Sequence, residues 1–152
     1  MIVAFFSVLG DPVPWSLSRT RDGRVYVSTR VQDWKDAVRA AAVEALRGEP
    51  LPLAPGVAVL VDLTFRIRRP RGHLGTGRNA DRLKPSAPRH HTSKPDKGNL
   101  EKAVLDALGV AGGSLPLVWC DDAQVTRGST FKRWARPGEE PGVDVAVAEI
   151  PC

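Results

Sequence analysis

The 152-residue sequence has few cysteines and no long apolar run, and these shortages exclude whole classes of protein. No stretch reaches the roughly 18 consecutive apolar residues that a membrane-spanning helix needs. Residues 1–8 lack the basic start and the cleavage site of a secretory signal, so we expect them to form a strand. Two cysteines, Cys120 and Cys152, are too few for a disulfide framework. The expected compartment is a reducing cytoplasm.

Chain length and composition predict one globular domain over residues 1–152. No internal repeat, heptad array or compositional boundary divides the chain. The 13 prolines and 14 glycines indicate either many turns or one long irregular segment, and the distribution below favours the long segment.

Positive charge is concentrated in one part of the chain. The net charge is +5, but residues 66–94 contain nine Lys or Arg against a single acid, Asp81. This segment therefore carries +8, and the rest of the chain sums to −3. A local excess of this kind is typical of a surface that binds a polyanion, although a solvated basic loop would look the same.

The first half of the chain predicts a strand, a hairpin and a helix. Residues 2–8 resemble a strand, and the Asp22-Gly23 turn signal before residues 24–28 indicates a small hairpin. From Thr29 the apolar period changes to that of a helix, which Gly48 should end. The apolar helix positions are Trp34, Val38, Ala41, Ala42, Ala45 and Leu46.

The clearest strand lies between residues 57 and 67, where every odd position is apolar. After it the chain has no period until Pro95. Long structureless connections are uncommon unless they are functional or disordered. We therefore expect the basic loop at 68–94 to be mobile in the absence of DNA.

The second half predicts a helix followed by strands. Asn99 is a plausible N-cap, and Gly109 with the Gly112-Gly113 pair should end the helix. Residues 123–134 and 143–147 then resemble strands. The order of elements predicts an α+β domain: a mixed, mostly antiparallel sheet with two main helices on one face and a long basic loop.

Three aspartates are the candidate metal ligands. Hydrolysis of a phosphodiester needs an activated water and neutralisation of the charge on the phosphorus centre and on the leaving oxygen. Hard cations held by carboxylates supply both. Asp96 precedes the second helix, and Asp121 and Asp122 precede a strand, so these acids stand at the ends of regular elements. Adjacent aspartates in an extended turn point in opposite directions, so we expect one to bind metal and the other to orient water or cap an amide.

Each of these residues also has a purely structural interpretation. Asp96 and the Asp121-Asp122 pair could be turn formers or caps. Lys102 could contact the scissile phosphate, or it could simply pair with Asp106 at i,i+4 on the helix surface.

The stretch from Lys94 through Leu108, KPDKGNLEKAVLDAL, followed by residues 121–125, DDAQV, resembles the RusA family of Holliday junction resolvases, common in phages and prophages. Pro12-Val13-Pro14 and residues 24–28 followed by a helix also fit the family pattern. The similarity covers most of the chain in order. The motif pair is its most specific part.

This resemblance implies a small homodimer in the bacterial cytoplasm that binds four-way DNA junctions and makes paired, symmetric nicks. Twofold protein symmetry suits the near-twofold junction. Magnesium is the implied cofactor, for which manganese could substitute. The family's catalytic positions map onto Asp96, Lys102 and Asp122, and Asp121 is a neighbouring metal ligand.

Gly98 departs from the family pattern, which usually has a second acid at this position. Losing one carboxylate weakens cation binding. Asp121 or Glu101 could substitute, or the protein could bind junctions without cutting them. The alternative function is therefore a non-catalytic DNA-binding recombination accessory protein, and a third is a module that binds an acidic protein.

The basic loop and its flanks are the expected DNA-binding surface. We expect His90 and His91 to face DNA or solvent rather than bind zinc. Trp119 is expected in the core or at a dimer contact, with base stacking as the alternative. The predicted DNA-binding residues are Arg69, Arg71, Arg78, Arg82, Lys84, Lys94 and Lys97.

Overall fold

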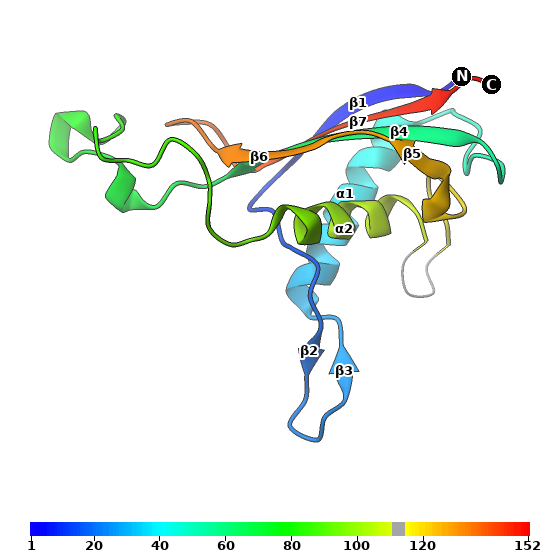
Figure 1. The fold of residues 1–152 in the computed structure, drawn as a ribbon, viewed down its shortest axis with the longest axis horizontal. Helices are drawn as coiled ribbons and strands as arrows, with labels where there is room; N and C mark the ends of the chain where they lie inside the picture. The colour runs from blue at the N-terminus through cyan, green and yellow to red at the C-terminus, as the bar shows by residue number, and fades with distance from the viewer. Residues whose placement is uncertain (111–114) are drawn as a thin grey trace.

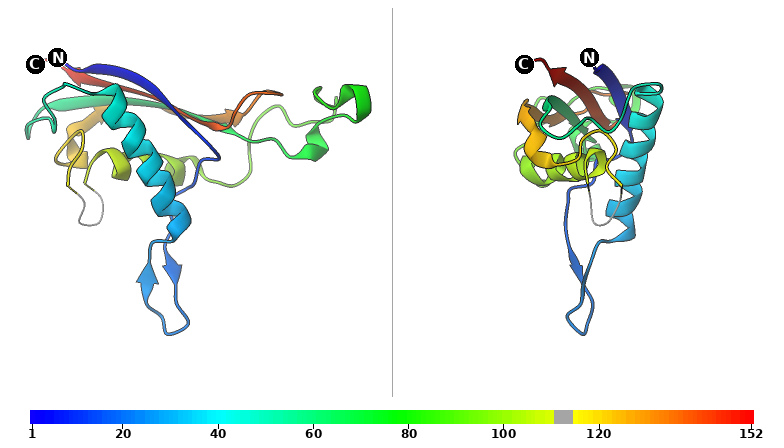
Figure 2. Two further views of the ribbon diagram at one scale, coloured as in Figure 1. Left: turned by 180° about the vertical axis from the view of Figure 1, so that it is seen from behind. Right: turned by 90° about the vertical axis from the view of Figure 1, so that its right-hand side faces the viewer.

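The computed structural model describes residues 1–110 and 115–152 and confirms the α+β prediction. A five-stranded mixed sheet carries helices α1 (Thr29–Ala45) and α2 (Lys97–Leu108) on one face (Figures 1 and 2). The expected glycine pair at 112–113 lies outside the described residues. Within the described part of the chain, no helix has the length and apolar character to cross a membrane.

The sheet is mostly antiparallel. Strand β7 (Gly142–Ile150) lies between β1 (Val3–Leu9) and β4 (Ala58–Ile67) and is antiparallel to both. Strands β5 (Val125–Arg127) and β6 (Thr130–Trp134) both run parallel to β4 on its other side.

Alternating side chains build the core, as the sequence predicted. In β4, Val59, Val61, Leu63 and Phe65 are all buried, and in β7 the same is true of Val143, Val145 and Val147. These residues pack with the apolar stripes of α1 and α2 in one hydrophobic cluster. A strand that is buried on one face alone must alternate apolar and other residues, which explains why these strands could be predicted from the sequence.

The single strand expected at residues 123–134 is wrong, because the structure divides it. A 3-10 turn, η3 (Asp122–Gln124), precedes β5, and Gly128 with Ser129 separates β5 from β6. Gly128 has φ +143° and its Cα faces the Val61 carbonyl, so no side chain fits there. The Asp62 carboxylate accepts hydrogen bonds from the Ser129 amide at 2.7 Å and hydroxyl at 2.6 Å.

The predicted N-cap of the second helix is also wrong. Asp96, not Asn99, occupies the N-cap of α2, so the helix begins two residues before Asn99. The helix ends at the Gly109 C-cap, as expected. Ser28 caps α1 by accepting a hydrogen bond from the Val31 amide.

Two projections leave the domain in different directions (Figures 1 and 2). One is the predicted hairpin of β2 (Ser18–Arg19) and β3 (Val25–Tyr26). The other is the basic loop, which we call the basic arm (residues 68–94). It contains the 3-10 turns η1 (Arg71–His73) and η2 (Gly77–Asn79) and a bridge between Leu74 and Leu83, so it has more regular structure than the sequence indicated.

Candidate functional site

Asp96 lies in a cleft where the hairpin, the basic arm and α2 meet. Although it is the N-cap residue, its side chain makes no capping hydrogen bond. Instead, Lys94 Nζ lies 2.7 Å from its carboxylate and lowers the pKa of Asp96. Asp96 is therefore an exposed, ionised carboxylate that helix capping does not use. The cleft is lined by Pro12, Pro14, Trp15, Ser16, Arg30, Lys94, Pro95, Asp96 and Asn99.

Lys132 holds the chain that leads into Asp96. From β6, its Nζ donates to the carbonyls of Ser93 at 2.8 Å and Pro95 at 2.9 Å. Sequence reasoning missed this residue, because nothing local links it to residues 93–95. It is a positioning residue for the start of α2.

Lys102 lies on the exposed side of α2, between an acid and an aromatic ring. Its Nζ is 3.3 Å from Asp106 Oδ1 and 4.9 Å from the centre of the Trp15 ring. The surface pair anticipated from sequence is thus present. Its side chain is 48% exposed, so the ammonium group can still reach a phosphate.

Asp122 and Asp121 lie beyond the other end of α2. Asp122 Oδ1 accepts a hydrogen bond from the indole of Trp119 at 2.9 Å. Trp119 is fully buried, so it orients this carboxylate and is not exposed for stacking on a base. Asp121 caps η3 by accepting from the Ala123 amide at 2.8 Å.

Gln124 fixes the aspartate turn to the body of the protein. Its buried side chain accepts hydrogen bonds from the amides of Cys120 and Asp121 and donates to the carbonyls of Ala54 and Val57. All four bonds span 2.9–3.1 Å. One side chain thereby sets the position of the turn before β4 relative to the aspartates.

We expect Gln124→Leu to lower the free energy of unfolding by about 2–3 kcal/mol, because it leaves buried backbone groups without partners. Urea denaturation would measure this loss. Gln32→Leu is the matched control, since Gln32 is exposed on α1 and its side chain bonds only to Asp36 among the described residues. We expect a change within about 0.5 kcal/mol there. Equal effects at the two positions would contradict this role for Gln124.

The two groups of acids do not meet within the chain. Asp96 directly precedes α2. Asp122 lies at the other end of the helix, close to Gly109: a Cβ added to Gly109 would lie 2.6 Å from the Asp122 carboxylate. The 12 residues between these ends span about 18 Å at 1.5 Å per residue. Among the residues that the structure describes, no group of three or more His, Cys, Asp or Glu is placed to hold a metal ion.

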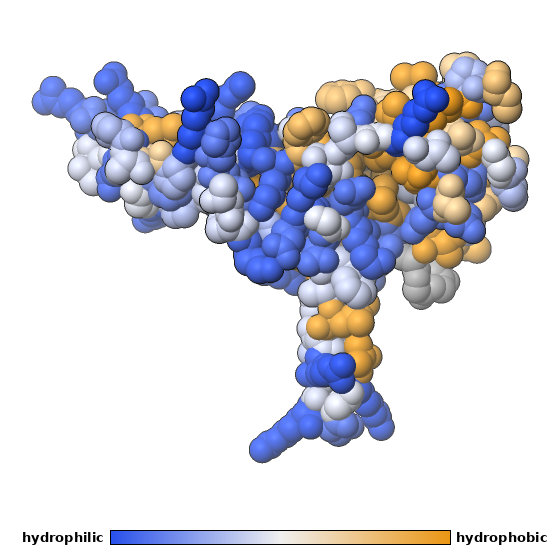
Figure 3. Space-filling model, viewed as in Figure 1, coloured by the Kyte–Doolittle hydropathy of each residue, from blue (hydrophilic) through white to orange (hydrophobic). Residues whose placement is uncertain are grey.

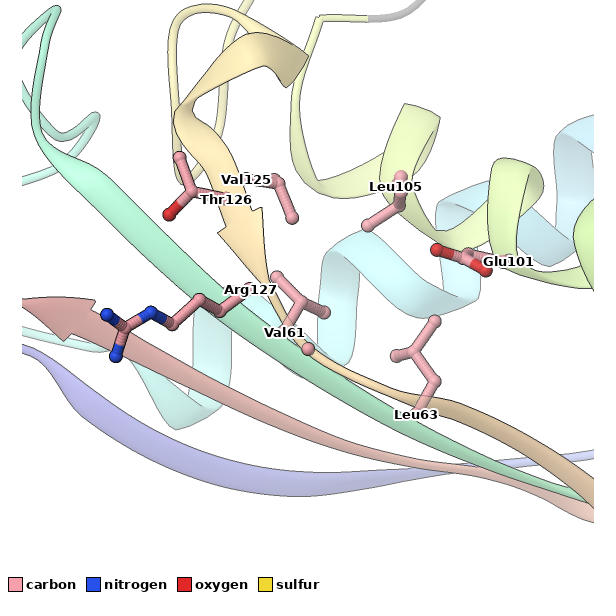
Figure 4. A pocket seen from close by; sticks show the side chains of 8 residues that line it. Val61, Leu63, Glu101, Leu105, Val125, Thr126 and Arg127 are labelled. Atoms are coloured by element: carbon pink, nitrogen blue, oxygen red, sulfur yellow. The ribbon is translucent and has the colours of Figure 1, made fainter.

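A groove follows the middle of α2 between these two ends (Figure 4). Glu101 and Leu105 from α2 face Val61 and Leu63 of β4 and Val125 of β5 across it. Thr126 and Arg127 of β5 and the following Gly128 complete the lining, so the groove combines apolar and polar surface.

The predicted DNA-binding side chains lie mostly on exposed surface. Arg69 is half-buried: its guanidinium donates to the Pro88 carbonyl at 2.9 Å and stacks on Trp134. Arg66, counted above with the basic segment, is buried and paired with Asp144, so it cannot contact DNA. The exposed members are Arg71, Arg78, Arg82, Lys84, Lys94 and Lys97.

An aromatic cluster attaches the basic arm to β6. The rings of His73 and His91 both meet Trp134 edge to face, with centroids at 5.1 Å and 4.3 Å. His91 is only 6% exposed, so the expectation that it faces DNA or solvent is wrong. Burial, with a further contribution from Lys132, lowers the pKa of His91, which keeps the ring neutral.

Comparison with known proteins adds one finding to this geometry. The family model described as endodeoxyribonuclease RusA matches residues 11–148. The match includes both acid groups, Lys102, the hairpin and the basic arm. No curated protein sequence matches the chain.

Proposed function

Because the chain belongs to the RusA endodeoxyribonuclease family, we propose that it acts as a homodimer that resolves four-way DNA junctions by paired, magnesium-dependent nicks. The observation that carries this proposal is the family match over residues 11–148. The exposed basic surface around Asp96 supports it, since a polyanion is attracted to such a surface.

The metal site would be shared between protomers. Within one protomer Asp96 and Asp122 are a helix length apart, so they do not fit a common cation. A twofold axis near the middle of α2, beside Glu101 and Leu105, would pair two α2 helices antiparallel. Asp96 would then lie at the same end as the partner's Asp122. The groove beside α2, with its mixed apolar and polar lining, offers a surface for this pairing.

The residues around this shared site would have different roles. Asp96 and the partner's Asp122, flanked by the partner's Asp121, would hold magnesium, which neutralises phosphate charge and activates water. Lys102 would bind the scissile phosphate. Lys94, Lys97 and the basic arm would hold the DNA backbones nearby.

The test is incubation of the purified protein with a synthetic four-way junction, with magnesium and with chelator. We expect matched nicks on opposing strands in magnesium only. Manganese should support the same products. Nicks that do not require a divalent cation would contradict the cofactor proposal.

One observation favours a second function: position 98, two residues after Asp96, is a glycine and not an acid. With one carboxylate fewer than the family pattern, the chain could bind junctions without cutting them. Gel retardation of the junction without nicks, in either magnesium or manganese, would support this accessory role over the enzyme.

A further inference from the structure

The β2–β3 hairpin stands clear of the domain (Figures 1 and 2). Apart from Ser18, every residue from 16 to 27 is exposed. Its position is nevertheless tied to the cleft at Asp96, because Ser16 and Arg30, which flank the hairpin in sequence, line that cleft.

The hairpin tip has a defined shape. The Thr20 amide donates to the Arg24 carbonyl at 2.8 Å, and the Arg24 amide donates to the Thr20 hydroxyl oxygen at 3.0 Å. The Thr20 hydroxyl also contacts Asp22, and Gly23 supplies the positive φ of +88° that the turn needs. One threonine thus organises the whole turn.

The tip is positively charged. Asp22 pairs with Arg24 at 3.3 Å, and its hydrogen bond with Thr20 lowers the pKa of Asp22, so this pair is neutral overall at pH 7. Arg19 and Arg21 have no acidic partner among the described residues. Figure 3 shows hydrophilic side chains on the basic arm, at the hairpin tip and on the surface between these two projections. The apolar side chains of the hairpin are confined to its stem: Leu17, Val25, Tyr26 and Val27.

The hairpin and the basic arm diverge from the same cleft. Lys94, at the end of the basic arm, lines the cleft together with Ser16 and Arg30. A straight duplex that follows the basic arm leaves the cleft in one direction and cannot also follow the hairpin (Figure 1). Two duplex arms that separate at a branch point can follow both projections.

We propose that the hairpin tip is a second DNA-contacting element that grips the duplex arm next to the one held by the basic arm, and so provides the preference for branched over linear DNA. This inference rests on the proposed function. A two-stranded ribbon fits the major groove of B-DNA, which is about 12 Å wide. Arg19 and Arg21 would contact phosphates at its edges.

The test compares two variants that lower the net charge by the same two units. Arg19→Gln/Arg21→Gln changes the tip, and Arg47→Glu changes an exposed arginine just after α1, outside both projections and away from the α2 groove. Binding to a four-way junction and to a linear duplex of the same length is measured over a range of salt. For the tip variant we expect junction affinity to fall about tenfold more than duplex affinity. Its salt slope should also fall by about 1.8, or 0.9 for each lost phosphate contact. The control variant should change both substrates equally.

A third variant, Thr20→Val, keeps every charge but removes the hydroxyl that shapes the tip. We expect it to lose part of the junction preference, with an unchanged Tm because the residue is exposed. If the wild-type protein binds no junction, both the proposed function and this inference fail. If the wild type prefers junctions and the tip variant keeps that preference, only the inference about the hairpin is overturned. A tip variant that changes oligomeric state and not DNA binding would also overturn it.

Discussion

Asp96→Asn and Asp122→Asn should each lower the rate of junction nicking by about 100-fold or more while junction binding survives. Both changes remove a charge that a cation needs and preserve the local structure. The Asp96 side chain makes no capping hydrogen bond that asparagine would lose, and at position 122 the amide oxygen of an asparagine could still accept from Trp119. Cleavage assays and gel retardation on the same junction would measure the two effects.

Mixing these two inactive variants should restore part of the activity. If each metal site takes Asp96 from one protomer and Asp122 from the other, a mixed dimer has one intact site and one site with both changes. Random exchange makes half of the dimers mixed, so about a quarter of the sites should be active. These dimers should make single nicks and not paired ones. Mixing Asp96→Asn with itself is the control.

No recovery in mixed dimers, verified with two affinity tags, would rule out a site shared between protomers. It would leave the importance of each acid intact. Full cleavage by either single variant would instead contradict the assignment of that aspartate.

Gly98→Asp should raise magnesium-dependent cleavage at least severalfold. It would place a second carboxylate two residues after Asp96, where more negative charge strengthens cation binding. The backbone accepts the change, because no atom lies within 4 Å of an added Cβ and Gly98 does not have a positive φ. The position is also in the first turn of α2, where an acid interacts favourably with the helix dipole.

Gly98→Asn is the matched control, since asparagine has the size of aspartate without its charge. We expect it to leave cleavage near the wild-type rate. An unchanged rate for Gly98→Asp with intact junction binding would refute this interpretation of the position. Single-turnover cleavage at several magnesium concentrations would separate tighter cation binding from faster chemistry.

Strands and helices could be predicted from the sequence wherever burial on one face produces a regular spacing of apolar residues. The alternation in β4 and the stripe of α2 follow from their own residues, so no distant contact is needed to predict them. The division between β5 and β6 could not be read in this way. It depends on the close approach of Gly128 to Val61 and on the bond between Ser129 and Asp62, which join parts of the chain far apart.

The same limit applies to the functional site. The residues Asp96, Lys102 and Asp122 were identified because the two motifs that contain them resemble the RusA family, yet the separation of the acids by the length of α2 is visible only in the fold. Lys132 and Trp15 were missed because their contacts with residues 93–95 and with Lys102 cross between distant elements. Similarly, nothing in the basic segment indicates that His91 is buried against Trp134.

If the metal site is shared between protomers as proposed, the length of α2 between the two aspartates has a consequence for control in the cell. A lone chain would then hold only part of the ligands of any one site, and newly made molecules would not cut DNA until they pair. Nicking would then rise with the square of concentration at low copy number and fade on dilution. Such a dependence would confine strand cutting to moments of high expression.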